Sequence, residues 1–388
     1  MVKKKLIIGI TSPKSTSLLV GQLKYFTNLG YETYLMCPND LRVEEYFRNE
    51  DCNCKHIPIA IEREIHLVRD IKSLWAIYKA MRKIKPDIVN VGTPKMGFLG
   101  ILAAKLLKVR GRIYTCRGLR YEREKGLKRK ILIFMEWFSG FCAHKIICIS
   151  PSVKETGIKD NVFNPQKCVV INKGSSNGLD LKRFSRETIE EHSIEQLKRE
   201  LCLERKFVFG YAGRLSDEKG INELFEVFEQ IYSTNSDVRL LCVGTFDMNQ
   251  IADKRLIKRM EQHSGVLLVG RQIKSIIPLY LSIIDVFVSS TWGEGFGNTL
   301  IEVAAMGVPV ISTSVTGVKD AVSNGYNGTL IPVKDKESLK QVMIEFMFDD
   351  AKRKRFGTNG IEWAKNFSNE IIWEGMAEIY SDYIYNIE

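Results

Sequence analysis

The chain has 388 residues, of which 45% are apolar, and it carries a net charge of +11. This length suits two domains of roughly 150–200 residues better than one, and the apolar content excludes a disordered chain. No apolar run reaches the roughly 18–20 residues of a membrane-spanning helix, and the apolar stretch 6–11 is too short for a secretory signal, so we expect a cytoplasmic protein.

Short apolar runs alternate with helical patterns through the first half of the chain. The predicted strands are 6–11, 32–37, 87–92, 112–116, 145–150 and 169–172. The predicted helices are 16–29, 67–84, 96–107 and 126–142. Strands that alternate with helices predict a parallel sheet covered on both faces.

The second half repeats this pattern. Its predicted strands are 207–212, 239–243, 266–269, 286–289, 309–313 and 329–332. Its predicted helices are 220–233, 249–262, 275–283, 298–306, 335–348, 350–366 and 370–386. We therefore expect an α/β protein with two Rossmann-like, doubly wound domains at 1–184 and 185–369. A helix at 370–388 would cross back to the first domain. Ligands of such sheets bind at the carboxyl ends of the strands, so both domains should face a cleft.

Charge is unevenly divided between the two halves. Residues 1–200 hold 37 Lys and Arg against 21 Asp and Glu, whereas residues 201–388 hold 20 against 25. The basic half should face an anionic partner such as a membrane, a phosphate-bearing acceptor or nucleic acid. The nine cysteines contain no Cys-X-X-Cys pair, and the five histidines lack metal-ligand spacing, so we expect reduced thiols and no such metal site.

The most informative segment is 290–310. A predicted strand ends at Ser290, a loop with Gly295 and Gly297 follows, and a helix begins near residue 298. Glycines permit close approach of the backbone, and a helix N-terminus attracts anions. Glu294 and Glu302 lie eight residues apart, where two carboxylates could hold sugar or ribose hydroxyls. The alternative is a capping loop with a solvated glutamate.

The segment 210–220 leaves the first strand of the second half and enters a helix. Arg214 and Lys219 could clamp a diphosphate, the arginine in a bidentate manner and the lysine as a point charge. The alternative is a pair of surface cations balanced by Asp217 and Glu218.

Together these segments resemble the retaining GT-B glycosyltransferases usually numbered family 4. Glu294-Gly-Phe-Gly…Glu302 is similar to the paired-glutamate signature of that family, and Gly213-Arg214…Lys219-Gly220 is similar to its diphosphate motif. Segments 86–97, 148–152 and 174–180 are similar to first-domain segments of capsule and exopolysaccharide enzymes. The resemblance covers nearly the whole chain.

The resemblance implies a role for each matching residue. Glu294 would contact the transferred sugar and support an oxocarbenium-like state, Glu302 would hold the ribose, and Arg214 with Lys219 would neutralise the leaving diphosphate. Arg271 would sit near the base. The remaining donor-binding residues would be Gly295, Phe296, Gly297, Asn298, Thr299 and Leu300. No cofactor is expected, and the sequence has no Asp-X-Asp triplet that would imply a metal.

The first domain departs from the family pattern at one place. Many relatives carry a His-Gly pair where this chain has Arg117-Gly118. Arg117 and Arg120 could contact an acceptor phosphate, or they could form a surface ion-pair cluster with Glu122 and Glu124. The loop that contains Lys14 and Ser15 would also line the acceptor or phosphate side, although it lacks a Gly-X-Gly-X-X-Gly pattern.

A basic stretch precedes an apolar helix at 126–142. Residues 117–130 hold seven Lys and Arg against two Glu, and the helix contains Phe134, Trp137, Phe138 and Phe141. This pattern indicates an interfacial contact with an anionic membrane, or else an ordinary core helix with a basic cap.

The expected function is transfer of a hexose or N-acetylhexosamine from a nucleotide-diphosphate sugar, UDP rather than GDP, to a lipid-diphosphate-linked saccharide in bacterial surface polysaccharide synthesis. The enzyme would be peripheral on the inner membrane. One alternative is another GT-B enzyme, such as a sugar-nucleotide epimerase or a phosphorylase, but the residues these require are not evident. A basic protein that binds nucleic acid is the other, but no nucleic-acid-binding module supports it.

Overall fold

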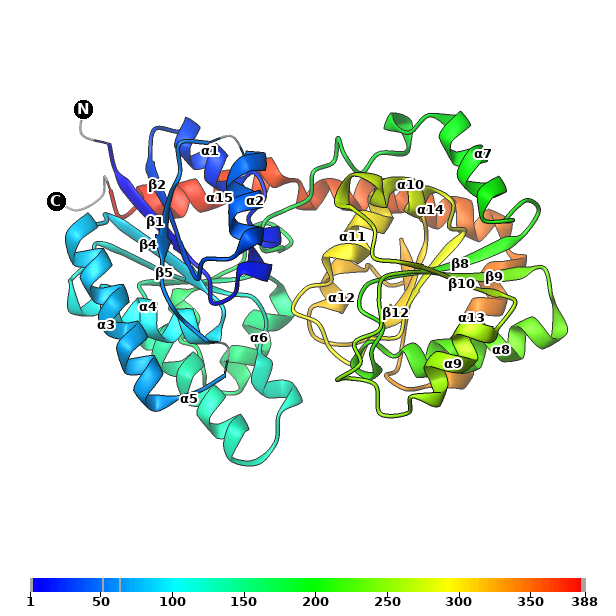
Figure 1. The fold of residues 1–388 in the computed structure, drawn as a ribbon, viewed down its shortest axis with the longest axis horizontal. Helices are drawn as coiled ribbons and strands as arrows, with labels where there is room; N and C mark the ends of the chain where they lie inside the picture. Colours follow the sequence, from blue (N-terminus) through cyan, green and yellow to red (C-terminus); the bar gives the residue numbers. More distant parts are fainter. Residues whose placement is uncertain (1–2, 51, 63, 385–388) are drawn as a thin grey trace. The chain divides into compact units, whose positions relative to one another are not determined.

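The computed structural model describes residues 3–50, 52–62 and 64–384, and the chain divides into two compact units (Figure 1). The first unit comprises residues 1–178 and 369–388, and the second comprises residues 179–368. The expected domain boundaries were 184 and 369. The last helix, α15 (Asn369–Ser381), belongs to the first unit, and the end of its predicted range, 385–386, lies outside the described residues.

The first unit is built on a parallel sheet in the order β3-β2-β1-β4-β5-β6-β7. Its strands are β1 (Lys5–Gly9), β2 (Glu32–Cys37), β3 (Lys55–Pro58), β4 (Ile88–Gly92), β5 (Gly111–Cys116), β6 (Lys145–Cys148) and β7 (Cys168–Val169). Its other α-helices are α1 (Gln22–Asn28), α2 (Leu41–Glu50), α3 (Leu67–Ile84), α4 (Pro94–Leu106), α5 (Gly126–Cys142) and α6 (Pro151–Lys159).

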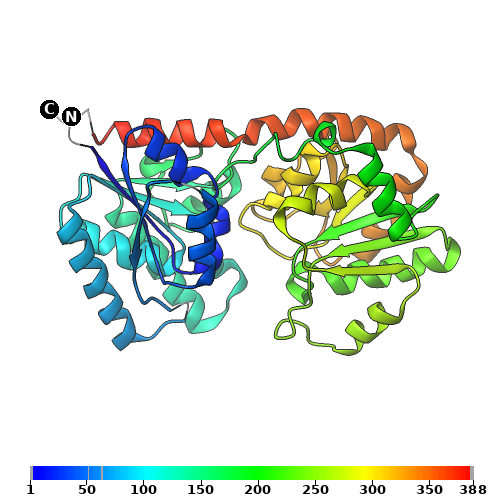
Figure 2. The same cartoon turned by 45° about the horizontal axis from the view of Figure 1, so that its top comes forward.

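Two apolar cores cover the two faces of this sheet. One core joins the sheet to α3, α4 and α5 through residues such as Ile77, Leu99 and Met135. The other joins it to α1, α2 and α15 through Phe26, Tyr46 and other side chains. In Figure 2, α15, drawn in red, runs beside the blue α1, and the rings of Phe26 and Tyr380 are 5.1 Å apart. The unit is therefore doubly wound, as the alternating pattern predicts.

Several predicted elements of the first unit differ from the structure. The helix expected at 16–29 is a 3-10 turn at Pro13–Leu18 followed by α1, because Gly21 has a φ of +77° and a Cβ there would meet Trp373 at 2.6 Å. In place of the strand expected at 169–172, the structure has the shorter strand β7 (Cys168–Val169). The elements α2, α6 and β3 were not predicted, and β3 buries only Ile57, so it lacks a readable apolar pattern.

The second unit is built on a parallel sheet in the order β10-β9-β8-β11-β12-β13. Its strands are β8 (Phe207–Ala212), β9 (Val238–Val243), β10 (Val266–Gly270), β11 (Val286–Ser289), β12 (Val310–Thr313) and β13 (Gly328–Ile331). Its α-helices are α7 (Glu191–Glu200), α8 (Ile221–Thr234), α9 (Arg255–Gln262), α10 (Ile277–Ser282), α11 (Asn298–Ala305), α12 (Val318–Ala321), α13 (Lys336–Phe348) and α14 (Asp350–Ala364).

The helix expected at 249–262 begins only at Arg255. The preceding residues are held in turns instead, since the backbone N–H of Ala252 donates to the carboxylate of Asp217 and that of Gln250 donates to the carbonyl of Asp247. Among residues 3–50, 52–62 and 64–384, no helix has the length and apolar character needed to cross a bilayer.

Candidate functional site

The two informative segments of the second unit lie next to each other. Segment 213–220 follows β8 and segment 290–297 follows β11, and these strands pair in parallel. The carboxyl ends of adjacent parallel strands meet at one edge of the sheet. The fold thus brings together two motifs that are separated by about 75 residues in the chain, the separation of Lys219 and Glu294.

Backbone contacts lock these two loops together. Gly220 has a φ of +69°, and a Cβ at this position would stand 2.0 Å from the carbonyl oxygen of Ser290. The hydroxyl of Ser290 donates to the carbonyl of Gly220 at 2.7 Å, and the N–H of Trp292 donates to the carbonyl of Glu218 at 2.8 Å. Only glycine satisfies both the conformation and the space at position 220.

Lys219 and Glu294 form an ion pair between the two loops. Their side chains are 15% and 30% exposed, so the pair is partly shielded from water. A partly shielded pair is electrostatically stronger than one on the open surface. One cation of the predicted diphosphate clamp is therefore held against the predicted catalytic carboxylate.

Arg214 is half exposed and lies among acceptor groups. Its guanidinium donates to Glu218 at 2.9 Å, to Asp247 at 3.0 Å and to Gln250 at 3.2 Å. The carboxylate of Asp217 instead accepts from Asn222 and from the backbone of Ala252, so it braces the loop rather than balancing the arginine. A diphosphate would have to exchange places with these acceptors to reach Arg214.

The glycine loop leads directly into α11. Gly297 has a φ of +86°, and the carbonyl of Gly295 lies so close to Gly317 that a Cβ there would be 2.4 Å away. The first N–H groups of a helix have no partner within it, so α11 presents donors at its start. Asn298 begins the helix, and its Oδ1 is buried without a hydrogen bond. Thr299 follows it in this first turn.

Phe296 of this loop and Leu300 of α11 bury their side chains. Phe296 is buried and packs on Phe367 with ring centroids 5.3 Å apart, and Leu300 is also buried. Only their backbone groups are available to a nucleotide sugar.

Glu302 lies in the second turn of α11 and is partly buried. Burial raises the pKa of this carboxyl to about 7, while the positive charges of Arg183 and Lys274 act to lower it. Arg183 also donates a hydrogen bond to the carbonyl of Lys274. Sequence reasoning missed both cations because they belong to no motif and lie far from Glu302 in the chain.

Arg271 lies three residues before Lys274 in the chain. It is exposed and directly follows β10, and β9 and β8 separate that strand from β11. Its predicted contact with the base stays a prediction.

Comparison with known proteins identifies the family. The model described as "Glycosyl transferases group 1" matches residues 193–363, and the model described as "Glycosyltransferase Family 4" matches residues 19–183. The chain is 34% identical over 385 residues to the "Capsular polysaccharide biosynthesis glycosyltransferase CapM" of Staphylococcus aureus, covering 99% of this chain and 98% of that relative. The chain belongs to the group 1, family 4 glycosyltransferases.

A second relative agrees with this assignment, and a solved structure has the same fold. The glycosyltransferase is 29% identical to the "UDP-Gal:alpha-D-GlcNAc-diphosphoundecaprenol alpha-1,3-galactosyltransferase" of Escherichia coli, over 84% of this chain and 83% of that one. It matches Anabaena Alr3699/HepE in complex with UDP at a TM-score of 0.80 and 17% identity, over 98% of this chain and 100% of that chain. At this identity the structural likeness shows the GT-B fold of two Rossmann-like domains.

In the first unit of the glycosyltransferase, the predicted acceptor-side residues differ in their exposure and charge pairing. Arg120 lies 3.8 Å from Glu124, which also pairs with Lys128, so an ion pair of the kind expected in the alternative is present, and a phosphate contact of Arg120 stays a prediction. Arg117 takes no part in such a cluster. Lys14 is exposed and Ser15 partly buried in the 3-10 turn after β1, so their role stays a prediction.

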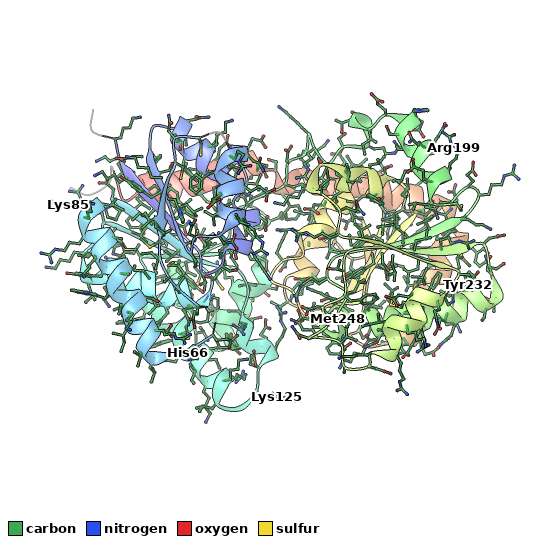
Figure 3. The ribbon with its side chains drawn as sticks, viewed as in Figure 1. His66, Lys85, Lys125, Arg199, Tyr232 and Met248 are labelled. Atoms are coloured by element: carbon green, nitrogen blue, oxygen red, sulfur yellow. The ribbon has the colours of Figure 1, made fainter. Side chains whose placement is uncertain are left out.

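The glycosyltransferase exposes apolar stripes on two helices of the first unit. On α5, Phe134 and Phe141 are 52% and 57% exposed, and Leu127, Ile131 and Trp137 extend the stripe. On α3, Leu67 and Trp75 are 79% and 55% exposed, and Val68 and Ile71 lie between them. The α3 stripe was not predicted, although its spacing of three, four and seven residues was readable in the sequence. Figure 3 places His66 and Lys125, which precede these helices, toward the lower edge of this unit.

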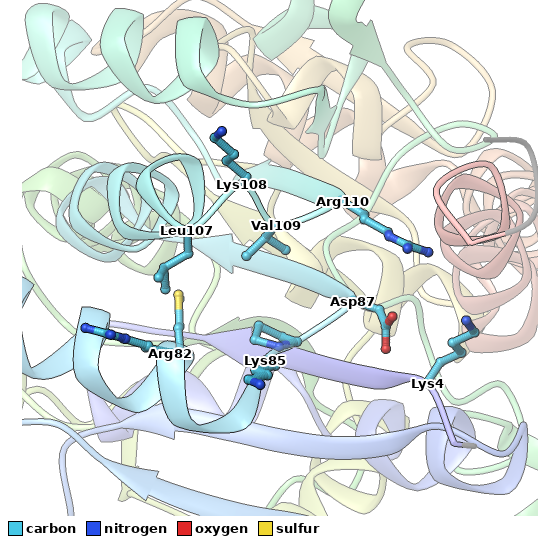
Figure 4. A pocket seen from close by; sticks show the side chains of 10 residues that line it. Lys4, Arg82, Lys85, Asp87, Leu107, Lys108, Val109 and Arg110 are labelled. Carbon is cyan, nitrogen blue, oxygen red and sulfur yellow. The ribbon is translucent and has the colours of Figure 1, made fainter. Parts of the chain in front are cut away.

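A cavity of about 510 Å³ lies at the edge of the first unit's sheet where its strands begin (Figure 4). Its walls include Lys4, Arg82, Lys85, Lys108 and Arg110. None of the predicted site residues of the glycosyltransferase lines it, and ligands of parallel sheets bind at the opposite edge. We therefore do not assign this cavity to catalysis.

Proposed function

We propose that this glycosyltransferase moves a hexose or N-acetylhexosamine from a nucleotide-diphosphate sugar to a lipid-linked saccharide, with retention of configuration, in bacterial surface polysaccharide synthesis. The capsular relative supports the pathway, and the Escherichia coli relative supports a UDP-sugar donor and a diphosphoundecaprenol-linked acceptor, since its name states both for that protein. The observation that carries the proposal is the ion pair between Lys219 and Glu294, which joins the diphosphate motif to the paired-glutamate motif.

The chemistry then follows from the charges at this edge of the sheet. Departure of a nucleoside diphosphate places negative charge where Lys219, Arg214 and the first turn of α11 can stabilise it. Glu302 is placed to accept hydrogen bonds from ribose hydroxyls. Once the diphosphate takes Lys219, Glu294 is free to support positive charge on the transferred sugar. Because these groups supply the electrostatic stabilisation, we propose that transfer needs no metal ion.

We further propose that the enzyme is peripheral on an anionic membrane surface. The exposed stripes of α3 and α5 carry aromatic side chains, and basic residues accompany both, such as Lys79 beside Trp75 and Lys105 beside Phe141. Apolar area with flanking lysines suits the interface of an anionic bilayer. An acceptor anchored in the membrane would then be within the enzyme's reach.

The first test is a thermal-shift panel of UDP, GDP, CDP, ADP and dTDP, each with and without EDTA. A ligand that binds only the folded state raises the melting midpoint. We expect UDP to give the largest shift, EDTA to leave it unchanged and Arg214→Ala to abolish it. Arg255→Ala is the matched control, since Arg255 is exposed and paired with Asp253, two residues earlier in the chain. A shift that GDP alone produces would overturn the donor assignment, and a loss with EDTA would overturn metal independence.

Transfer itself is then measured with radiolabelled UDP-sugars and a lipid-diphosphate-linked saccharide. We expect a labelled lipid product whose anomeric configuration matches that of the donor. Product with the opposite configuration would rule out retention.

A further inference from the structure

Arg117 is partly buried, and its guanidinium lacks hydrogen-bond partners at two of its three nitrogens. Its Nε and Nη1 are buried and make no hydrogen bond. Burial lowers the pKa of this group to about 10, and within the described chain only the tyrosines Tyr114 and Tyr380 oppose that effect. Arginine stays charged at neutral pH, so the protein holds an uncompensated positive charge here. Such a charge is costly unless a ligand of opposite sign completes it.

The backbone beside Arg117 packs closely against it and has an unusual conformation. The side chain follows β5 and lies against β4, where a Cβ on Gly92 would stand 3.0 Å from its Nε. The next residue, Thr93, has a φ of +74°, which is rare for a β-branched residue. Its hydroxyl accepts a hydrogen bond from the N–H of Thr11 and shares another with the Thr11 hydroxyl. Strained backbone of this kind persists where a site requires it.

The neighbouring strand end contributes a second unpartnered donor. Ser175 donates its N–H to the carbonyl of Ile149, just past β6, and the hydroxyl of the following Ser176 is buried without a hydrogen bond. Since β6 pairs with β5, Ser176 and Arg117 belong to adjacent ends of the same carboxyl edge. A cation and a hydroxyl at one edge match the oxygens of a phosphate.

We propose that Arg117 binds a phosphate group of the acceptor, and so distinguishes a phosphate-linked saccharide from a neutral one. This inference rests on the proposed function, since that function supplies an acceptor of this class. Arg120, which is paired with Glu124, is not part of the site.

Binding of the anion is tested without catalysis. Pyrophosphate is titrated against the Arg214→Ala/Lys219→Ala variant, in which the donor clamp is disabled, and the melting midpoint is followed. We expect a rise that Arg117→Gln abolishes and Arg110→Ala preserves. Arg110 is the matched control because it is exposed and lies just before β5, at the opposite end of the strand from Arg117. A rise that survives Arg117→Gln, or no rise at all, would overturn the proposal.

Selectivity is tested with two acceptors that carry the same saccharide, one on a short-chain prenyl diphosphate and one on a neutral octyl glycoside. We expect Arg117→Gln to lower the ratio of their kcat/KM values roughly 10–100-fold, the size of one or two hydrogen bonds to a charged group, while the donor KM is unchanged. An unchanged ratio contradicts the proposal, as does an increase confined to the donor KM. If Arg117→Gln does not fold, Arg117→Lys, which keeps the charge but loses the fork, should lower the ratio in the same direction.

The two arms separate this inference from the proposed function. If the wild-type enzyme transfers sugar to neither acceptor, the proposed function fails, but the pyrophosphate titration still decides whether Arg117 holds an anion. If transfer occurs, and Arg117→Gln changes neither the pyrophosphate titration nor the ratio of kcat/KM values for the two acceptors, only this inference fails.

Discussion

The ammonium group of Lys219 contacts the carboxylate of Glu294, and this pair joins two loops that approach within hydrogen-bonding distance through Ser290 and Gly220. The pair has a mechanistic consequence. Under the proposed function, a donor diphosphate would compete with Glu294 for Lys219, so nucleotide binding and release of the glutamate would be linked.

Glu294→Gln should therefore separate binding from turnover. Loss of the carboxylate frees Lys219, so the Kd for UDP should stay the same or decrease, whereas kcat should fall by about 10²–10³-fold because a group that supports the transition state is gone. Calorimetry gives the Kd and single-turnover kinetics give the rate. Glu229→Gln is the control, since this carboxylate is 30% exposed, like that of Glu294, and is paired with Arg259. If Glu294→Gln weakened UDP binding as much as Glu302→Ala does, this division of roles would be contradicted.

Glu302 predicts a pH dependence of nucleotide binding. Its pKa is raised to about 7, so the carboxylate that we propose accepts ribose hydrogen bonds forms mainly as the pH rises through that value. Between pH 6 and pH 8 the ionised fraction increases about tenfold, and affinity for UDP should increase by a similar factor. The same titration of Glu302→Gln reports the change that comes from the nucleotide's own phosphate. Identical pH profiles in the two proteins would contradict the assignment.

Substitution of Gly220 should lower the stability of the protein for two separable reasons. Gly220 and Gly325 both have positive φ, at +69° and +77°, but a Cβ would clash with Ser290 only at position 220. Gly325→Ala should lower the free energy of unfolding by about 1–2 kcal/mol, the cost of the left-handed conformation alone. Gly220→Ala should cost more and should also weaken UDP binding. Urea unfolding of both variants makes the comparison, and equal losses would show that the two loops are not locked at this point.

The stripes on α3 and α5 predict binding to anionic vesicles. We expect the wild-type protein to sediment with phosphatidylglycerol vesicles but weakly with phosphatidylcholine vesicles, and binding to decrease with salt. Ile71→Ser/Trp75→Ser and Trp137→Ser/Phe141→Ser should each reduce the bound fraction several-fold. Phe348→Ser is the control, since Phe348 is 74% exposed in the second unit. Equal binding by all four proteins would exclude these helices as the contact.

Titration of Glu136 should make the free energy of unfolding decrease as the pH rises from the acidic range through about 7, and level off above it. This residue is buried on α5, it accepts a hydrogen bond from Tyr114 at 2.6 Å, and burial raises its pKa to about 7. Because the folded pKa exceeds the unfolded one, its protonated form favours folding, and that contribution is lost as the pH rises through about 7. Between pH 6 and pH 8 the free energy of unfolding should fall by about 1 kcal/mol more in the wild type than in Glu136→Gln. Parallel pH profiles from denaturant unfolding would contradict the raised pKa.

The sequence was most informative where structure depends on local pattern. Helices α3 and α5 were predicted with the bounds that the structure has, as were β2, β8 and β11, because apolar periodicity over these lengths reports which face is buried. Short elements with few buried residues, such as α2 and β3, were not predicted, because their apolar pattern spans too few residues to be recognised. Sequence also identified the loops at 213–220 and 290–297, since glycine spacing and charged residues mark them directly.

Contacts between distant residues were decided only by the tertiary structure. The pair of Lys219 with Glu294, the cations Arg183 and Lys274 near Glu302, and the unpartnered guanidinium of Arg117 all depend on which strands adjoin in the sheet. Sequence alone thus determined the family resemblance and the residue types at the site. Only the fold decided which charges are paired, because electrostatic partners are set by distance in space and by burial, not by separation along the chain.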